Sequence, residues 1–562
     1  MRRAIIARLS CATLSIGLGG CGGTATVAPP VPPTLNYATA KDDPASGSVV
    51  FLDQGWSPEL IRAWYRTPQG SQLVPYDWFL ALEQADNDRP FRAAEVIDRF
   101  RYLPQEPGEG NPDGLPVGFS NGDDDKGRAW LGFTCAACHT GQVEYKGKKV
   151  RIEGGPTLGD LAPFRDAMLA AFRATLADPA KFDRFAARVH KPTDPTKAEA
   201  LRKEVEAFLV VMAALEERSK PEHPEGFGRV DAFTILMNEM LGTVAGEPAN
   251  YRKVIAPVSY PFLWGAPKLE WVQWNGAVQN AIARNDGEVL IVFGHAEATP
   301  RGDDVLIRST GKIKNLIDLE DWTRTLTPPR WPEGILGPID VVKAGKGHEV
   351  YLKAGCDRCH ADKPPYPESA PNKYGKTFTK VARTPLSELK TDPVMAENFL
   401  SRTAKTGKFA RLFGGAPEVP AWQMVYMGLV KLIEGDLPAA GLDADQILAA
   451  GGFRELNIPS KEDLTAYKSG PLAGIWATAP FLHNGSVPSL YQLLLPAKDR
   501  VKVFHVGSRE FDPKDVGFES GPSPGAFEFR VDVPGNANSG HEYGTDLPED
   551  DRRALIEYLK SL

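Results

Sequence analysis

The chain has 562 residues, of which 42% are hydrophobic, so it can bury a large core and should contain about two to four domain-sized units. Its formal net charge is -7. Phosphate binding needs clustered lysines and arginines, so this acidic balance argues against nucleic acid as a partner.

The first residues have the pattern of an export signal. Arg2, Arg3 and Arg8 precede an apolar stretch and small residues, the usual layout of a secretory signal, here residues 1–20. The "LGGC" that ends at Cys21 resembles the lipobox of bacterial lipoproteins, whose cysteine is lipidated, although cleavage nearby without lipid is the alternative. Residues 21–45, rich in Pro, Gly and Ala, are expected to form a flexible tether.

These features predict where the protein works. We expect an exported lipoprotein of a Gram-negative bacterium, in the periplasm or on the outer membrane or cell surface. No later run is apolar and long enough to span a membrane, so lipid is the only expected membrane anchor.

Two CxxCH motifs, "CAACH" and "CDRCH", hold four of the six cysteines, and the other two lie in the signal and at the lipobox. This spacing suits covalent haem, because two thiols can bind the vinyl groups of the porphyrin while the next histidine reaches the iron from below. The motifs therefore predict two haem c groups. The residues that would hold them are Cys135, Cys138, His139, Cys356, Cys359 and His360.

Two alternatives to haem are weaker. Four thiolates could make a zinc site, but the pairs would have to meet across the chain and both histidines would be unexplained. A redox dithiol normally opens a helix after a strand, whereas "KGRAWLGFT" and "AGKGHEVYLKAG" before the motifs look helix-like.

The pattern along the chain predicts a mainly α fold made of two cytochrome c-type haem domains, with long irregular connections and a few short strands. Residues 46–335 would form the N-terminal haem domain with extensions, and residues 336–562 the C-terminal one. Residues 143–155 alternate like a hairpin, residues 158–189 and 197–219 are helical in period, and residues 547–562 read as a closing amphipathic helix.

The sixth ligand of each iron decides between electron transfer and reaction with oxygen or peroxide. No methionine follows Met427, and the only strong ligand in the loop "VPGNANSGHEYGTDL" is His541. We expect His541 to close the second haem, with His483, His505 or a purely structural role for all three as alternatives. Such a bis-histidine iron would transfer electrons.

For the first haem no candidate stands in a recognisable ligand setting, so an open iron is expected by default. The residues weighed are His190, His223, His295 and the methionines from Met168 to Met240. Of these methionines, Met168, Met212 and Met237 lie in helix-like runs and are expected to be core residues.

Several stretches resemble one known group. "GLPVGFS", "HTGQVEYKGKKVRIEGGPTLGD", "YPFLWGAPKLEWVQWNG" and "GIWATAPFLHNGSVPSLYQLL" are similar to the rubber oxygenase group of di-haem c-type cytochromes, which belongs with the bacterial di-haem cytochrome c peroxidases. The resemblance covers residues 114–562. It implies that His139 holds an oxygen-binding haem, while His360 and His541 hold the second haem.

The resemblance also implies roles for aromatic residues. Phe262, Trp264, Trp271 and Trp274 would line the active pocket or lie between the haems, unless the tryptophans are only core residues. Trp476 and His483 would lie beside the second haem, with His483 hydrogen-bonded rather than bound to iron.

The expected function is a haem-dependent oxidoreductase that activates O2 or H2O2 at the first haem. As an oxygenase it would cleave a C=C bond of an apolar substrate. As a peroxidase it would take electrons from a small redox protein and need a nearby carboxylate, for which Glu270 and Glu288 are candidates. A pure electron carrier is the third alternative. Rubber oxygenases are secreted, so a lipid at Cys21 departs from that group.

Overall fold

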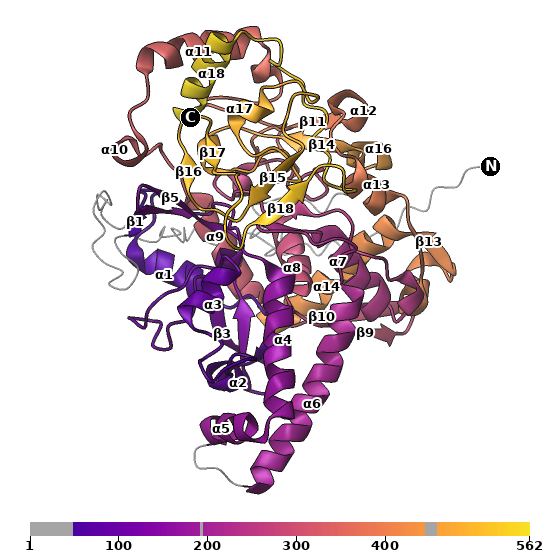
Figure 1. Ribbon diagram of the computed structural model, residues 1–562. Helices are drawn as coiled ribbons and strands as arrows, with labels where there is room; N and C mark the ends of the chain where they lie inside the picture. The colour runs from indigo at the N-terminus through magenta and orange to yellow at the C-terminus, as the bar shows by residue number, and fades with distance from the viewer. Residues whose placement is uncertain (1–48, 191–194, 444–457) are drawn as a thin grey trace, which may run out of the picture. The chain divides into compact units, whose positions relative to one another are not determined.

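A computed structural model describes residues 49–190, 195–443 and 458–562 (Figure 1). The predicted signal at residues 1–20, the tether at 21–45 and Cys21 lie outside the described residues. The described residues all belong to one compact unit. No helix among the described residues is long and apolar enough to cross a membrane.

Helices start where the sequence supplies caps or proline. The Ser57 side chain accepts the Leu60 N–H at the start of α1, and the Asp340 carboxylate accepts the Lys343 N–H at the start of α11. The described α-helices are α1 (Pro58–Arg66), α2 (Tyr76–Ala81), α3 (Ala94–Arg99), α4 (Leu161–Ala177), α5 (Pro179–His190), α6 (Pro195–Arg218), α7 (Ala232–Met237), α8 (Ala281–Ile291), α9 (Ile313–Thr325), α10 (Glu333–Leu336), α11 (Val341–Lys353), α12 (Leu386–Leu389), α13 (Val394–Leu400), α14 (Ala421–Ala440), α16 (Lys461–Leu464), α17 (Leu490–Leu493) and α18 (Glu549–Lys560).

The strands form small separate sheets. Two sheets have three strands: β1 (Val49–Phe51), β6 (Lys148–Glu153) and β5 (Thr140–Tyr145), and β2 (Val74–Pro75), β4 (Ala129–Phe133) and β3 (Phe119–Asp123). The two-stranded pairs are β7 (Arg229–Val230) with β8 (Val258–Ser259), β9 (Ala296–Arg301) with β10 (Asp304–Ser309), β11 (Ala382–Pro385) with β14 (Ala466–Ser469), β12 (Thr403–Lys405) with β13 (Glu418–Pro420), β15 (Val503–Val506) with β18 (Phe527–Arg530), and β16 (Phe511–Asp512) with β17 (Gly517–Phe518).

The prediction of a mainly α fold with two cytochrome c-type domains is wrong. The structure is 40% helical and 17% strand, with many small sheets, so the fold is mixed α/β. The reason is visible before the first motif: residues 126–134, expected to be helix-like, include β4, which pairs antiparallel with β3 around a turn at Gly127. Gly132 fits that strand because a Cβ there would lie 2.2 Å from the Ser71 carbonyl oxygen.

Other predicted elements are present. The hairpin is β5 and β6, which turn through Lys146 and Gly147, both at positive φ. The periodic runs become α4, α5 and α6, and the closing helix is α18.

The last helix packs closely on the helix that precedes the second motif. α18 buries Leu555, Tyr558 and Leu559, and a Cβ at Gly347 of α11 would lie 2.0 Å from the Ala554 carbonyl oxygen. Figure 1 shows α11 and α18 side by side. This contact fixes where the chain enters the second CxxCH turn.

One buried cluster joins distant parts of the chain. It contains residues of the N-terminal segment such as Trp56 and Trp64 together with C-terminal residues such as Trp476 and Leu555. Both regions that flank the motifs therefore share core packing, and the division at residues 335 and 336 stays a prediction.

Candidate haem sites

The two CxxCH motifs adopt the same local conformation. Each lies on a short 3-10 turn, η2 (Cys135–Ala137) and η6 (Cys356–Arg358). In both, the histidine N–H donates to the carbonyl of the first cysteine at 2.9 Å. All four cysteines are free. The repeated turn places two thiols and one imidazole in the same mutual arrangement at both places.

Each motif histidine is fixed by a backbone carbonyl. His139 Nδ1 lies 2.8 Å from the Pro261 oxygen, and His360 Nδ1 lies 2.9 Å from the Gly470 oxygen. A carbonyl can only accept, so Nδ1 carries the proton and Nε2 keeps its lone pair. This is the arrangement in which a histidine binds a metal through Nε2.

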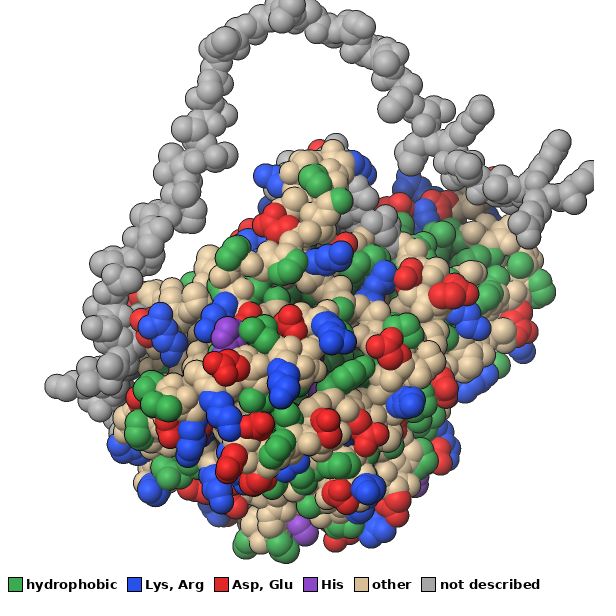
Figure 2. Space-filling view, turned by 90° about the horizontal axis from the view of Figure 1, so that it is seen from above, with side chains coloured by type: hydrophobic (Ala, Val, Ile, Leu, Met, Phe, Trp, Pro, Cys, Tyr) green, Lys and Arg blue, Asp and Glu red, His purple; other side chains and the backbone are tan. Residues whose placement is uncertain are grey.

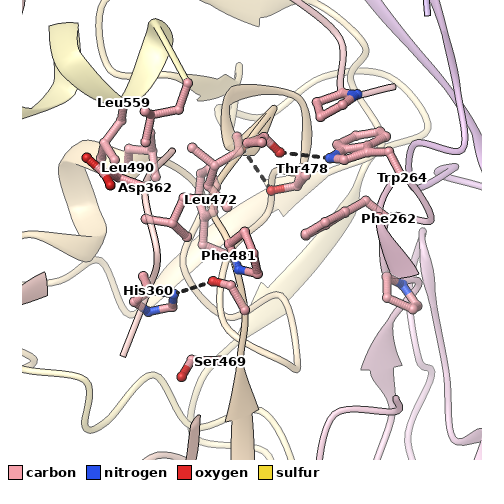
Figure 3. Close-up of a pocket in the computed structure, with 18 of the residues that line it drawn as sticks. Phe262, Trp264, His360, Asp362, Ser469, Leu472, Thr478, Phe481, Leu490 and Leu559 are labelled. Atoms are coloured by element: carbon pink, nitrogen blue, oxygen red, sulfur yellow. Dashed lines mark hydrogen bonds between the residues drawn. The ribbon is translucent and has the colours of Figure 1, made fainter. Parts of the chain in front are cut away.

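A cavity of about 1440 Å³ lies beside the second motif (Figure 3). Cys356, Cys359, His360 and His541 all line it. Its walls are largely aliphatic and aromatic, and they include Phe262, Trp264, Leu472, Phe481, Leu490 and Leu559. An apolar space of this kind suits a large flat aromatic ligand.

His541 faces His360 across this space. The ring centroids are 6.3 Å apart and the ring planes meet at 57°. Two metal–nitrogen bonds of about 2 Å and half a ring on each side account for that separation. Burial lowers the pKa of His541 to about 4, so its imidazole is neutral and can act as a ligand.

The backbone holds His541 in place. Its N–H donates to the Leu389 carbonyl at 2.9 Å, and its own carbonyl accepts from Arg500 at 3.1 Å. The residue has a φ of 48°, which a non-glycine residue rarely adopts. Its Nδ1 is buried without a hydrogen-bond partner among the described residues. These features fit an imidazole that is held in position to act as a metal ligand.

The first motif lies deeper in the protein than the second. Burial lowers the pKa of His139 to about 4 and raises the pKa of Cys135 and Cys138 to about 12. All three residues are nevertheless only half-buried by their exposed surface. A thiol pair and an imidazole that are neutral and partly accessible suit covalent attachment of a haem.

Charged side chains of α8 and α9 lie near the first motif. After burial, the largest effect on the pKa of Cys135 is the Glu288 carboxylate, which raises it, followed by the Arg284 guanidinium, which lowers it. Arg284 Nη2 donates to Glu320 at 3.0 Å, and Gln273 Nε2 donates to Glu288 at 2.7 Å. Burial raises the pKa of Glu288 above its ordinary value.

Glu288 also lines a small pocket of about 40 Å³. Arg284 and Gln273 are its other strongly polar members. The remaining walls are Ala232, Phe233, Leu236, Ala277, Val278, Ile291, Phe399, Val425, Tyr426 and Leu429. A single hydrogen-bonded carboxylate is thus set among apolar groups.

The aromatic residues singled out in the sequence separate into two groups. Phe262, Trp264, Trp274 and His483 line the cavity of the second motif. Trp271 instead packs under the Arg383 guanidinium, and Trp476 is fully buried against Trp331 with its Nε1 on the Pro329 carbonyl. Their roles toward a haem stay predictions.

The other ligand candidates lie elsewhere. Met168 and Met212 are in a buried cluster with α4 to α6, and the Met237 sulfur accepts from Arg402. His223 is exposed, and His505 lies in β15 opposite Glu528. Glu270 is half-buried and its N–H donates to the Thr379 carbonyl.

The two backbone segments that hold the motif histidines contact each other. Phe262 and Trp264 follow Pro261, and their rings stack with centroids 4.9 Å apart. Trp264 Nε1 donates to the Ala473 carbonyl at 2.8 Å, three residues beyond Gly470. Figure 3 shows this hydrogen bond and that of His360. The carbonyls that hold His139 and His360 therefore belong to segments that contact each other directly.

The structure argues against both alternatives to haem. Across the described residues, no group of three or more His, Cys, Asp or Glu side chains is arranged to hold a metal ion. Redox thiols need a lowered pKa, whereas burial raises the pKa of Cys135 to about 12 and that of Cys356 to about 11. The first motif also leads into β5 rather than a helix.

Sequence reasoning missed Pro261, Gly470, Gln273 and Arg284. Any residue can offer a backbone carbonyl, so nothing in the sequence marked Pro261 or Gly470 as acceptors. Arg284 and Glu288 stand four apart, a spacing that places both on one face of a helix and could have marked them as a pair.

Comparisons with known proteins agree with this chemistry. Residues 466–505, from β14 to β15, match the family described as RoxA-like, cytochrome c-like. The uncharacterized protein y4iJ of Sinorhizobium fredii is 33% identical over 581 aligned positions, which cover 93% of this chain and 94% of that protein. The uncharacterized protein y4iM of the same organism is 26% identical over 54% of this chain and 63% of its own length. The chain therefore belongs to the family of y4iJ and is related to the RoxA-like cytochromes c, which makes it a haem c redox protein.

Proposed function

We propose that the protein binds two covalent haems and is an oxidoreductase that reduces peroxide at the first site, with electrons arriving through the second. The observation that carries this proposal is the contrast between the sites. Two histidines face each other at the second motif, whereas a hydrogen-bonded carboxylate lies near the first.

The bound haem would supply a redox-active iron. The side chains around it would transfer protons and define the space in which the substrate binds. Reduction of H2O2 to two waters consumes two electrons and two protons. Glu288 can carry a proton because burial raises its pKa toward neutrality. Gln273 donates to one Glu288 oxygen, and the other lies 3.9 Å from Arg284 Nε, so both polar neighbours hold the carboxylate in place. Arg284, bound to Glu320, keeps a positive charge nearby.

The second site would serve electron transfer. His360 and His541 would both hold the group there, and a haem with two histidine ligands would supply electron transfer rather than reaction with oxygen. The Trp264 hydrogen bond to Ala473 provides a direct connection toward the segment that holds His139.

A second candidate is an oxygenase acting on an apolar substrate. The resemblance of several stretches of the sequence to the rubber oxygenase group of di-haem cytochromes supports it. Polyisoprene latex under O2 is the test substrate, and cleavage products formed without added electrons would support this candidate.

The peroxidase proposal is tested with purified holoprotein, H2O2 and a reduced small cytochrome. We expect turnover in the wild type and a loss of about 100-fold in kcat in Glu288→Gln, the size typical of a lost acid–base group. Glu270→Gln is the matched control and should keep wild-type turnover. Spectra showing only low-spin haem before and after reduction and ligand addition would overturn the proposal.

We further propose that the protein is exported and lipidated at Cys21. Metabolic labelling with palmitate should mark the wild type and not Cys21→Ser. An unlabelled wild-type protein would refute lipidation.

A further inference from the structure

The second CxxCH turn is much more exposed than the first. Ala136 and Ala137 are buried, whereas no residue of η6 is buried and its Asp357 and Arg358 are exposed. One turn earlier, Leu352 has 48% of its surface exposed. A partner protein can therefore contact the second motif directly. The first motif is covered by other parts of the chain.

The surface around this turn is basic although the chain as a whole is acidic. Residues 352–380 contain six basic and three acidic residues, against a net charge of -7 for the chain. The basic ones are all exposed: Lys353, Arg358, Lys363, Lys373, Lys376 and Lys380. We call these six residues the basic surface.

Much of this positive charge is not neutralised locally. Lys353, Arg358, Lys363 and Lys380 form no ion pair with any described residue. The nearby acids are partly engaged: Asp362 accepts from Tyr558, and Glu368 accepts from Thr377. The field at this surface is therefore positive toward solvent.

The same charges reach the mouth of the second cavity. Exposed Arg358 and Lys363 line the cavity, as do exposed Lys268 and Arg330. The Thr379 N–H donates to the Lys268 carbonyl, which places Lys268 next to the Lys380 end of the basic surface. Asp53 and Glu388 are the exposed acids among the lining residues, so basic groups outnumber them there.

Apolar groups lie among these charges. Besides Leu352, the exposed residues Pro364, Pro365 and Pro367 follow the motif. Figure 2, which looks onto the end of the molecule that carries α11 and α18, shows apolar side chains interspersed with Lys and Arg on this face. Apolar contacts among rim charges are typical of transient protein interfaces.

We infer that the basic surface docks a small redox protein with an acidic face, which delivers electrons to the second site. This inference rests on the proposed function, because a redox partner can deliver electrons here only if a haem is bound at His360. Opposite charges would speed the encounter and align the partner over η6. A nucleic acid or an anionic membrane would bind through the positive charges alone, and its binding would not require the exposed η6 turn.

The test measures electron transfer from a reduced acidic plastocyanin to the full-length holoprotein by stopped flow. We expect the second-order rate constant to fall at least 10-fold between low and physiological salt. In Lys363→Glu/Lys380→Glu it should fall at least 10-fold at low salt. The matched control Lys197→Glu/Lys203→Glu, with the same charge change on exposed positions of α6, should retain the wild-type rate. Equal rates in all three proteins would overturn the inference.

Two further measurements separate docking from the proposed function. Calorimetric binding of oxidised plastocyanin needs no electron transfer, so it should be present in the wild type and weaken at least 10-fold in Lys363→Glu/Lys380→Glu. Reduction of the second haem by dithionite should be unchanged in that variant. Absence of a low-spin second haem would refute the proposed function, whereas absence of plastocyanin binding to the wild-type holoprotein would refute docking. Equal affinity of wild type and charge-reversed variant for plastocyanin, with loss only of phosphatidylglycerol vesicle binding, would assign the surface to lipid instead.

Discussion

The imidazole of His541 lies opposite that of His360, with ring centroids 6.3 Å apart, although 181 residues separate them in the chain (541 - 360). Because burial lowers the pKa of both imidazoles, both are neutral, and the pair could supply two ligands to one metal ion between them.

The first prediction concerns this pair. Replacing His541 by Ala removes one of the two imidazoles and should convert one low-spin haem to high spin. His505→Ala is the matched control, because His505 lies in β15 away from the cavity. Optical and EPR spectra of both oxidised variants check this, and an unchanged low-spin signal in His541→Ala would show that another group closes the second haem.

The second prediction concerns the tight packing under the first motif. Gly118 has a φ of 78°, and a Cβ there would lie 2.0 Å from the Ala137 nitrogen. Gly118→Ala should therefore displace the CxxCH turn and lower the haem-to-protein ratio from about two to about one. The free energy of unfolding should fall by about 2–4 kcal/mol, from backbone strain plus the clash.

Gly127→Ala is the control, because it introduces the same backbone strain as Gly118→Ala but no steric clash. Gly127 has nearly the same φ, 77°, with nothing within 4 Å of the added Cβ, so only the backbone penalty of about 1–2 kcal/mol applies. Pyridine haemochrome assays and urea unfolding measure both quantities. Equal haem content in the two variants would contradict the packing argument.

The third prediction follows from a buried pair of carboxylates. The Ser309 hydroxyl lies 2.5 Å from Asp436 and 3.1 Å from Asp286, and burial raises the pKa of both carboxyls above 3.8. Their stabilising proton is present at low pH and is lost as pH rises through the raised folded pKa. Stability should therefore fall as the pH rises above about 4 and these carboxyls lose their protons.

Asp286→Asn removes one charge and the shared titration. We expect a flatter dependence of Tm on pH and a higher Tm than wild type at pH 8, measured by circular dichroism. Exposed Asp303→Asn should leave the wild-type profile intact. A wild-type slope in Asp286→Asn would mean that other groups dominate the pH dependence.

The fourth prediction concerns the link between the motif histidines. Trp264→Phe and Trp331→Phe each lose one Nε1 hydrogen bond of 2.8 Å to a carbonyl, from Ala473 and Gly337 respectively. Each should cost about 1 kcal/mol in the free energy of unfolding. Only Trp264→Phe should also shift the EPR g-values of the haems. Identical EPR spectra of both variants would show that the Trp264 hydrogen bond does not affect the geometry of either haem site.

The sequence alone identified both CxxCH motifs, because covalent haem attachment requires a fixed local spacing that any fold must respect. It also indicated the hairpin at β5 and β6 and the closing helix α18, whose residue periods are local. The conformation of both turns likewise depends on neighbours within four residues.

Tertiary structure decided what surrounds those motifs. Residues 129–133 form a strand because they pair with β3, a contact outside the local sequence, so the expected helical approach to the first motif is wrong. Long-range contacts also bring Pro261 to His139, Gly470 to His360 and His541 to His360. Backbone carbonyls have no residue signature, and the distance between two remote side chains depends on the packing of everything between them. For these reasons the carbonyl partners of the motif histidines emerge only from the folded chain, whereas His541 and Glu288 were already candidates from the sequence.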